Sequence, residues 1–198
     1  MDATGTALVT GAGRGLGKAT ALELARRGFD VIATMRDTAA AGALLEAASS
    51  EGLAMRVEHL DVTRPDSIRM PDELSLLVNN AGVDVEYLPV EHAPIEMWRR
   101  AFETNVFGLI EVTRRAIPPL RAAGSSVICN VTSAAVLFPM PLYAAYRAGK
   151  AAVSSLGESL RAELAGFGIR VIEIMPGPID TDMLAASARE PEGAAFDD

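Results

Sequence analysis

Residues 6–28 have the sequence TALVTGAGRGLGKATALELARRG, in which a short apolar run is followed by closely spaced glycines and then by a helical pattern. Glycines at a strand-to-helix turn allow backbone angles that other residues avoid, and they let the chain approach a ligand closely. The amides at the N-terminus of the next helix favour an anion. The stretch therefore predicts a strand, a pyrophosphate-binding loop and a helix, although a glycine-rich turn that serves packing alone would have the same pattern.

Similar short runs recur along the chain and alternate with longer helical patterns. Their apolar character is continuous rather than alternating, as it is in the strands of a parallel sheet that helices cover on both faces. We therefore predict an α/β fold with a doubly wound parallel sheet of about six strands. The predicted strands span residues 6–10, 29–34, 55–60, 74–79, 126–133 and 169–175.

Two long helices are also predicted. The first spans residues 94–117 and ends before Pro118 and Pro119, because proline lacks the N–H group that continues a helix. The second spans residues 143–166, where alanines and leucines recur at every third or fourth position. In contrast, prolines limit any helix between the third and fourth strands to about two turns.

Composition limits the possible functions. A chain of 198 residues is long enough for one domain with a sizeable core. Lys and Arg number 18 against 26 Asp and Glu, which gives a formal charge of −8 and argues against nucleic acid as a partner. The N-terminus has no signal-peptide pattern, and no apolar run reaches the ~20 residues of a membrane span. These features predict a cytoplasmic protein with no membrane partner.

The cysteine and histidine content excludes a disulfide within the chain and argues against a metal site. The single cysteine, Cys129, lies in an apolar stretch and is expected in the core rather than as a reactive thiol. His59 and His92 have no other ligand type near them at metal-binding spacing. We therefore predict no metal.

Several motifs follow one another in an order that resembles the short-chain dehydrogenase/reductase family. The resemblance extends from Thr4 to about Met183 and implies a Rossmann-type sheet with strand order 3-2-1-4-5-6. It also implies an oxidoreductase that transfers hydride between a nicotinamide cofactor and a small carbonyl or secondary alcohol substrate. The motifs are TGAGRGLG (residues 10–17), NNAG (79–82), Asn105 within ETNVFG, Ser133, Tyr146 with Lys150, and the turn Pro176–Gly177.

Tyr146 and Lys150 lie four residues apart in the second long helix, so their side chains share one face. A free tyrosine is a poor base near neutral pH, whereas a nearby ammonium and a bound nicotinamide cation both favour tyrosinate. The resemblance implies that Tyr146 exchanges a proton with the substrate oxygen and that Ser133 hydrogen-bonds this oxygen. It further implies that Lys150 holds the nicotinamide ribose and that Asn105 anchors a water in a relay to Lys150. A tyrosine and a lysine on their own would indicate only a solvated helix face.

The resemblance also implies a set of cofactor-binding residues. Asp61 would receive the adenine amino group, although capping of the residues after Thr63 explains it equally well. Gly82 would let the adenosine ribose pass closely, whereas Asn79 is expected to tie neighbouring strands together. The complete set comprises Gly11, Arg14, Gly15, Leu16, Gly17, Arg36, Asp61, Val62, Asn80, Ala81, Gly82, Tyr146, Lys150, Pro176, Gly177, Ile179 and Thr181.

The end of the second strand bears on the choice between NAD and NADP. An acidic residue there would bind the ribose 2′-hydroxyl and favour NAD, but this chain has Met35 followed by Arg36. The guanidinium groups of Arg36 and Arg14 could both bind a 2′-phosphate. We therefore predict NADP, with NAD still possible because Arg36 could instead pair with Asp37 or face solvent.

The end of the chain departs from the family pattern. After residues 176–184 the family continues through a substrate-covering helix and a seventh strand, whereas residues 185–198 are acidic and rich in alanine. We expect residues 1–184 to form a single dinucleotide-binding and catalytic domain without the seventh strand, and residues 185–198 to be a disordered or truncated tail. The sixth strand would then be an exposed edge, and the substrate pocket would be open on one side.

The alternative function is a catalytically impaired dinucleotide-binding scaffold or regulator that lacks the substrate lid, but the intact Ser133, Tyr146 and Lys150 favour an enzyme. A sugar-nucleotide epimerase is disfavoured by the glycine spacing and the length. The substrate pocket is expected to be apolar, with Val136, Pro139, Tyr143 and residues 83–88 around it. The two long helices predict a homodimer that assembles through a four-helix interface.

Overall fold

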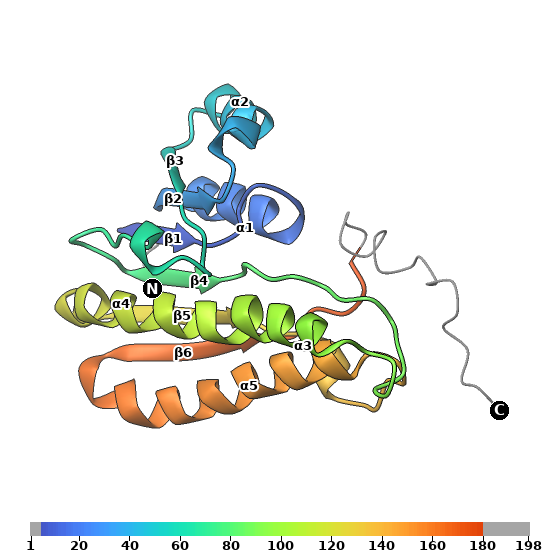
Figure 1. The fold of residues 1–198 in the computed structure, drawn as a ribbon. Helices are drawn as coiled ribbons and strands as arrows, with labels where there is room; N and C mark the ends of the chain where they lie inside the picture. The colour runs from blue at the N-terminus through green and yellow to red at the C-terminus, as the bar shows by residue number, and fades with distance from the viewer. Residues whose placement is uncertain (1–4, 180–198) are drawn as a thin grey trace.

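The computed structural model describes residues 5–179, which form a six-stranded parallel sheet and its connections (Figure 1). The strand order is β3-β2-β1-β4-β5-β6, so the predicted doubly wound sheet is confirmed. The strands are β1 (Thr6–Val9), β2 (Asp30–Met35), β3 (Met55–His59), β4 (Leu76–Asn79), β5 (Ser126–Val131) and β6 (Ile169–Ile174). The α-helices are α1 (Gly15–Arg26), α2 (Gly42–Ser50), α3 (Ile95–Phe102), α4 (Leu109–Ala122) and α5 (Ala144–Leu164). Short helical turns are η1 (Thr38–Ala41), η2 (Pro65–Ser67), η3 (Glu103–Gly108), η4 (Ala134–Val136) and η5 (Ala165–Phe167).

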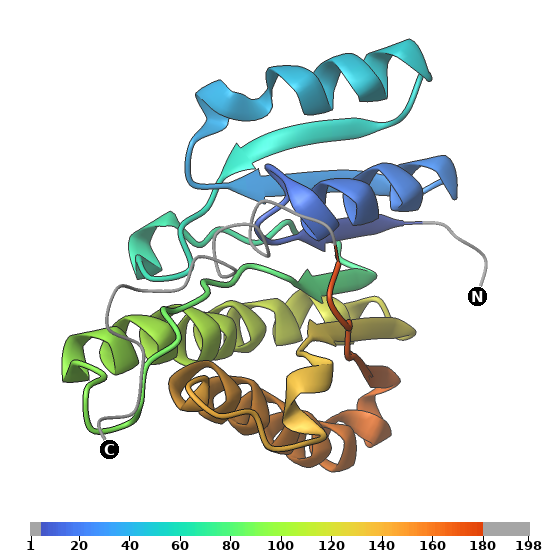
Figure 2. The same cartoon turned by 90° about the vertical axis from the view of Figure 1, so that its right-hand side faces the viewer.

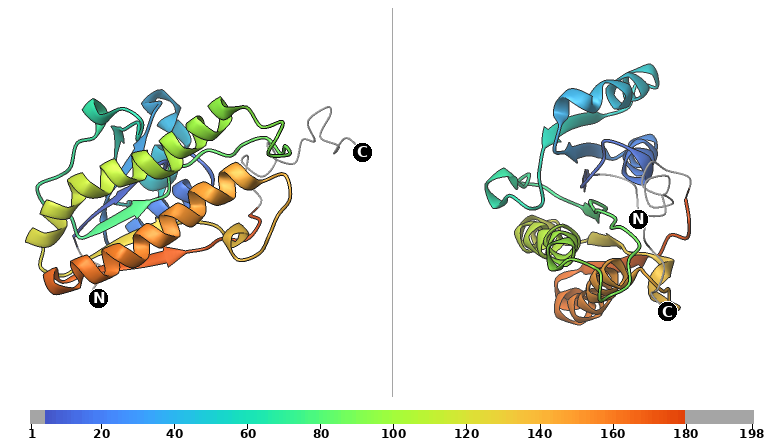
Figure 3. Two further views of the ribbon diagram at one scale, coloured as in Figure 1. Left: turned by 60° about the horizontal axis from the view of Figure 1, so that its bottom comes forward. Right: turned by 45° about the vertical axis from the view of Figure 1, so that its right-hand side comes forward.

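Helices cover both faces of the sheet, which explains why the strands are apolar at successive positions. In β1, Ala7 and Val9 pack in one core with residues of α1 and α2, whereas Leu8 packs in a second core with residues of α4 and α5. Figure 2 shows the strands from β3 at the top to β1 and β4 below. The right-hand view of Figure 3 places α1 and α4 on opposite sides of the sheet.

Cys129 lies near the middle of β5 and belongs to the same core cluster as residues of α1 and α2. Its side chain is buried, and this burial raises the pKa of the thiol to about 11. The prediction of a core residue rather than a reactive thiol is therefore confirmed, because the nucleophilic form of cysteine is the thiolate.

The sequence analysis predicted that the first long helix ends before Pro118 and Pro119, and this prediction is wrong. Helix α4 continues through both prolines to Ala122. The fixed φ of proline is compatible with a helix. Each proline therefore removes one backbone N–H donor from the helix but does not end it here. Leu120 holds the last turn in place: its side chain is fully buried, and its carbonyl accepts a hydrogen bond of 2.8 Å from Ser126 Oγ.

A π-helical turn, η3, separates α3 from α4, and the three segments run together beside α5 (left-hand view of Figure 3). Gly108 lies at its end, where a Cβ atom would come within 2.7 Å of Val62 Cγ2. The backbone of the turn therefore lies directly against the loop after β3. Isolated π-helical turns are often found at functional sites, and this one contains Asn105.

The connection from β3 to β4 contains only the short turn η2, within the limit that its prolines set. Ile68 and Leu74 from this connection are buried in the core under α4 and α5. These two side chains cover part of the core that a longer crossover helix would otherwise cover.

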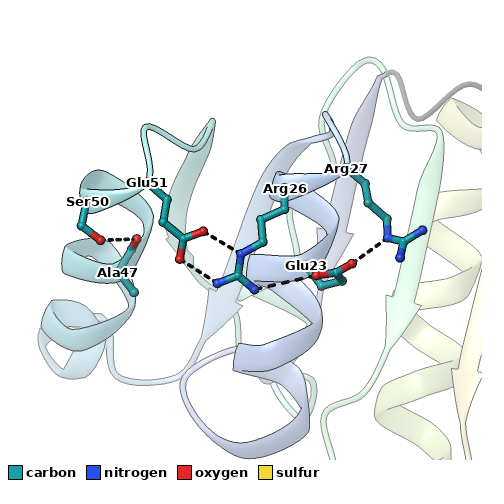
Figure 4. Close-up of polar contacts among 6 residues, drawn as sticks. All are labelled: Glu23, Arg26, Arg27, Ala47, Ser50 and Glu51. Carbon is teal, nitrogen blue, oxygen red and sulfur yellow. Dashed lines mark hydrogen bonds and ion pairs between the residues drawn. The ribbon is translucent and has the colours of Figure 1, made fainter.

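Ion pairs lie along the surface of α1, and one of them joins it to the end of α2 (Figure 4). Arg26 makes a two-pronged contact with Glu51, with Nε–Oε2 and Nη2–Oε1 distances of 2.6 and 2.7 Å. Arg27 pairs with Glu23 one turn earlier at 2.8 Å. These side chains are exposed, so both pairs stabilise the fold only slightly, and Arg26–Glu51 is the pair that links the two helices.

Strand β6 lies at one end of the sheet and pairs with β5. Val171 faces the core under α5, whereas Ile172 and Ile174 are 45% and 49% exposed on the other face. The predicted domain boundary at residue 184 and the tail 185–198 lie outside the described residues. Between residues 5 and 179 there is no helix with both the length and the apolar composition that a bilayer crossing requires.

Candidate active site

A cavity of about 510 Å³ runs along the carboxyl ends of the strands, where open α/β sheets bind ligands. Every predicted site residue within 5–179 lines it except Asn105, while Thr181 lies outside the described residues. Over this same range the structure contains no cluster of His, Cys, Asp and Glu side chains that could hold a metal ion. The lining residues from the predicted set are Gly11, Arg14, Gly15, Leu16, Gly17, Arg36, Asp61, Val62, Asn80, Ala81, Gly82, Ser133, Tyr146, Lys150, Pro176, Gly177 and Ile179.

Two glycines of the loop after β1 are required by the protein's own packing. Gly11 has a φ of +66°, and a Cβ atom there would lie 2.8 Å from Ala81 Cα. A Cβ atom on Gly17 would lie 2.3 Å from the Gly11 carbonyl oxygen. Helix α1 begins beside the cavity, and its first turn has no acidic residue. The N-terminal amides of α1 therefore give this end of the cavity the character of an anion site.

Thr10 and Asn80 fasten the glycine loop to the end of β4. The Thr10 hydroxyl oxygen accepts hydrogen bonds of 3.0 Å from the amides of both Asn80 and Ala81. Asn80 Nδ2 donates to the carbonyl oxygens of Thr10 and Gly11 at 2.9 and 3.1 Å. Asn80 thus shapes the cavity by fixing the loop, and Thr10 is a contributor that the predicted set omitted.

Asn79 ties neighbouring elements together, as the sequence analysis expected. Its Nδ2 donates to Asn130 Oδ1 on β5 and to Thr113 Oγ1 on α4, each at 2.9 Å. This buried contact places the ends of β4 and β5 side by side, and with them the NNAG motif and Ser133.

Ser133, Tyr146 and Lys150 meet at one end of the cavity. Ser133 follows β5, while Tyr146 and Lys150 come from the first two turns of α5. Tyr146 and Lys150 are 8% and 6% exposed, so they do not form a solvated helix face. Lys150 Nζ lies 5.7 Å from the centre of the Tyr146 ring and donates a hydrogen bond of 2.9 Å to the Val131 carbonyl.

Burial dominates the proton affinities of this group. It raises the pKa of Tyr146 to about 12, although a hydrogen bond with the Ser133 hydroxyl acts in the opposite direction. It lowers the pKa of Lys150 to about 8, against the charge of Asp84, which raises it. The expectation that Lys150 favours tyrosinate is thus outweighed within the protein alone, because both side chains are withdrawn from water.

Asn105 acts on the backbone of the cavity wall. Its Oδ1 accepts a hydrogen bond of 2.8 Å from the Val83 amide, and its Nδ2 donates one of 2.9 Å to the Val83 carbonyl. A Cβ atom on Gly82 would lie 3.2 Å from Asn105 Oδ1 and 3.7 Å from Lys150 Nζ. The missing side chain of Gly82 therefore lets the chain pass close to Asn105 and Lys150.

Asp61 lines the cavity and forms a local turn with Thr63, but it does not cap the following turn η2, whose N-cap Arg64 has no side-chain cap hydrogen bond. Asp61 Oδ1 accepts hydrogen bonds from the amide and the hydroxyl of Thr63 at 2.9 and 2.8 Å. Burial opposes ionisation, but the bonds from Thr63 and the charges of Arg36 and Arg64 outweigh it and lower the pKa of Asp61. An ionised acceptor therefore stands at this end of the cavity.

Arg36 and Arg14 line the same end of the cavity, at the end of β2 and in the glycine loop. Met35 is buried, and its side chain packs close to Gly13. Asp37 accepts a hydrogen bond of 3.0 Å from the Ala39 amide and thereby caps η1. Among residues 5–179, the described ion pairs do not join Asp37 to Arg36.

The three tyrosines of the chain form one stack beside the reacting end of the cavity. The ring centres of Tyr87 and Tyr143 are 4.5 Å apart, and those of Tyr143 and Tyr146 are 4.6 Å apart. The Tyr143 hydroxyl donates a hydrogen bond of 2.5 Å to Asp84 Oδ1. Burial, followed by this contact with Asp84, holds the pKa of Tyr143 far above its usual range. Tyr143 is therefore protonated, and its hydroxyl is occupied as a donor.

The family model for short chain dehydrogenases matches residues 5–192, which is nearly the whole chain. The chain belongs to the short-chain dehydrogenase family. The resemblance stated from the motifs is thereby confirmed, and with it the membership of a family of oxidoreductases.

Two curated relatives and one solved structure illustrate the similarity. This short-chain dehydrogenase is 39% identical to the uncharacterized oxidoreductase YusZ of Bacillus subtilis, over 91% of this chain and 67% of YusZ. It is 36% identical to estradiol 17-beta-dehydrogenase 2 of Rattus norvegicus, over 90% of this chain and 49%, about half, of that relative. Among solved structures, the closed form of serine dehydrogenase complexed with NADP+ has a TM-score of 0.84 at 30% identity, over 95% of this chain and 78% of that one.

The substrate end of this short-chain dehydrogenase differs from the expectation in detail. Tyr143, Val83 and Tyr87 line the cavity, but Val136 and Pro139 do not, and the neighbouring Phe138 and Met140 take their place. Asp84 was included only as part of a loop expected to be apolar. Asp84 lies in the loop five residues after β4 ends, and no local sequence signal distinguishes it from an ordinary loop carboxylate.

Proposed function

We propose that this short-chain dehydrogenase is an NADP-dependent oxidoreductase that interconverts a carbonyl group and a secondary alcohol. The observation that carries the proposal is that Ser133, Tyr146 and Lys150 share one cavity with the glycine loop and the N-terminus of α1. A proton-transfer group and an anion-binding loop in one cavity are the two parts that hydride transfer to a carbonyl requires.

The cavity suits a dinucleotide in both its shape and its polar groups. Glycines at the loop allow close backbone approach, the start of α1 favours a pyrophosphate, and the ionised Asp61 can accept the adenine amino group. Pro176, Gly177 and Ile179, which follow β6, would contact the nicotinamide end. When bound, the nicotinamide cofactor supplies or accepts the hydride.

The second strand favours NADP over NAD. The last position of β2, where an acidic residue would bind a 2′-hydroxyl, is Met35, which is buried, and the carboxylate of Asp37 two residues later caps η1. Arg36 and Arg14 line the cavity beside it, and guanidinium groups bind phosphates by charge-assisted hydrogen bonds. A similar solved structure holds NADP+, which is consistent with this choice.

Tyr146 is proposed as the general acid and base, because its hydroxyl lies beside Ser133 in a buried site. With a pKa near 12 it holds its proton at neutral pH, which suits donation to the oxygen of a carbonyl during reduction. Ser133 would hydrogen-bond the same oxygen. The ammonium of Lys150 would favour the tyrosinate that remains after donation, and Asn105 would position this group by fixing Val83.

The test is the variant Tyr146→Phe, which removes the transferable proton and little volume. We expect it to bind NADPH with unchanged affinity by fluorescence titration and to lose at least ~10²-fold in kcat on any ketone that the wild type reduces. Unchanged turnover would contradict the assigned role. If the wild type binds NADPH but reduces none of a broad set of ketones and oxidises no secondary alcohol, the scaffold function replaces the enzymatic one.

A further inference from the structure

Asp84 places a carboxylate in the part of the cavity where the substrate would lie. Its neighbours along the cavity wall are apolar or aromatic: Val83, Tyr87, Phe138 and Met140. The other carboxylates of the wall, Asp37 and Asp61, lie at the opposite end beside Arg36. The substrate end therefore has a negative charge of its own.

One oxygen of this carboxylate is available to a ligand. Tyr143 Oη and the Val85 amide both donate to Oδ1, at 2.5 and 2.9 Å. Within residues 5–179, none of the described ion pairs includes Asp84. A partly buried charge without a counter-charge is costly, so a cationic ligand at Oδ2 would relieve that cost.

The carboxylate is also held rigidly, as a specificity determinant should be. Tyr143, which donates to it, is stacked between Tyr87 and Tyr146. The segment before Tyr143 is joined to the Asp84 loop by a hydrogen bond of 2.9 Å from the Leu88 amide to the Leu142 carbonyl. Leu142 has a φ of +65°, a strained conformation that the surrounding contacts maintain.

The charge of Asp84 reaches the reacting groups. After burial and the bond with Ser133, it is a further cause of the raised pKa of Tyr146. At Lys150 it opposes the effect of burial. Geometry agrees with this effect, because Asp84 is bonded to Tyr143, whose ring centre lies 4.6 Å from that of Tyr146.

We infer that Asp84 determines substrate specificity and that the substrate is a ketone or secondary alcohol that carries a protonated amine. This inference rests on the proposed function. The ammonium group would donate to Asp84 Oδ2 while the carbonyl or hydroxyl oxygen lies at Tyr146 and Ser133. Tyr87, at the edge of the aromatic stack, would contact the part of the substrate next to its ammonium group.

The ammonium is favoured over two other polar groups. A carboxylate on the substrate would be repelled by Asp84, as like charges are at short range. A hydroxyl would donate one hydrogen bond but would leave the negative charge uncompensated. Only a cation both donates to Oδ2 and neutralises the carboxylate.

The test measures equilibrium binding of three matched ketones to the complex of the protein with NADP+, in which both partners are oxidised and no turnover occurs. The ketones are 4-(aminomethyl)acetophenone, 4-(hydroxymethyl)acetophenone and 4-acetylbenzoate, which differ in charge at one position. They are titrated calorimetrically into the wild type and the variants Asp84→Asn and Glu86→Gln. Asparagine keeps an acceptor for Tyr143, and Glu86 is a matched control because it pairs with Arg100 outside the cavity.

We expect the wild type to bind the ammonium ketone about tenfold more tightly than the hydroxymethyl ketone, and the carboxylate ketone most weakly. Asp84→Asn should bring the first two within about threefold, while Glu86→Gln keeps the wild-type order. An unchanged order in Asp84→Asn, equal binding of the first two ketones to the wild type, or no binding of the amine would each overturn the inference. Failure of the proposed function is seen separately, because NADP+ itself would then not bind before any ketone is added.

Discussion

Lys150 is expected to be required for activity while its buried charge lowers the free energy of unfolding. The variant Lys150→Met tests both effects. Burial lowers the pKa of Lys150 from 10.5 to about 8, which at ~1.4 kcal/mol per pKa unit corresponds to a cost of ~3 kcal/mol for the protonated side chain at neutral pH. Methionine has a similar length but loses the hydrogen bond to the Val131 carbonyl, worth ~1.5 kcal/mol for a charged donor. We therefore expect the variant to be inactive yet ~1–2 kcal/mol more stable than the wild type, with a Tm higher by ~4 °C.

The assay is urea unfolding followed by the fluorescence of the single tryptophan, Trp98, at several pH values. Between pH 8 and 10.5 the unfolded chain holds a proton that the folded Lys150 has lost, so wild-type stability rises with pH and the advantage of the variant shrinks. Lys18→Met is the matched control, because Lys18 is the only other lysine and makes just a 3.3 Å surface contact with the Ala43 carbonyl. We expect that control to change stability by less than ~0.5 kcal/mol. A Lys150→Met protein that is less stable than the wild type at neutral pH, or a difference that does not vary with pH, would refute the reasoning.

Four further variants test the cofactor site, the packing of two glycines and the assembly. Arg36→Ala should weaken NADPH binding about tenfold or more and NADH binding by less than about twofold, and equal losses in the two titrations would show that Arg36 does not bind the 2′-phosphate. Gly17→Ala would place a Cβ atom 2.3 Å from the Gly11 carbonyl oxygen and should cost more than ~2 kcal/mol of unfolding free energy. By comparison, Gly42→Ala meets no atom within 4 Å and should stabilise α2 by up to ~1 kcal/mol. Phe107 is 55% exposed on η3, so Phe107→Asp should convert the proposed dimer to a monomer in light scattering, and a persistent dimer would count against an interface through the long helices.

The strands and the reacting pair were predictable from local sequence because their signals are local. Leu8 and its neighbours are buried on alternating faces, so a continuous apolar run is enough to indicate a covered parallel strand. The spacing of Tyr146 and Lys150 likewise places both on one face of any helix. The path of α4 through Pro118 was missed because tertiary packing of its last turn decides it.

Other features of the site depend on contacts between distant parts of the chain. The bond between Asp84 and Tyr143 joins residues 59 positions apart, and neither residue has a local pattern that indicates the other. The π-helical turn at Asn105 has the same kinds of residues as an α-helix, and its two bonds to Val83 are formed only when the loop after β4 folds back. The low pKa of Lys150 follows from its burial, which the spacing of charged residues does not reveal.

The single thiol of the chain is also a natural reporter of opening motions. Cys129 is buried near the middle of β5, and a pKa of about 11 leaves almost no thiolate while the sheet is closed. A disulfide reagent can then modify it only in molecules whose β5 has separated from its neighbours. The labelling rate of the unaltered protein would therefore measure how often the centre of the sheet opens, and its slowing by NADPH would give the coupling between cofactor binding and that opening without any engineered probe.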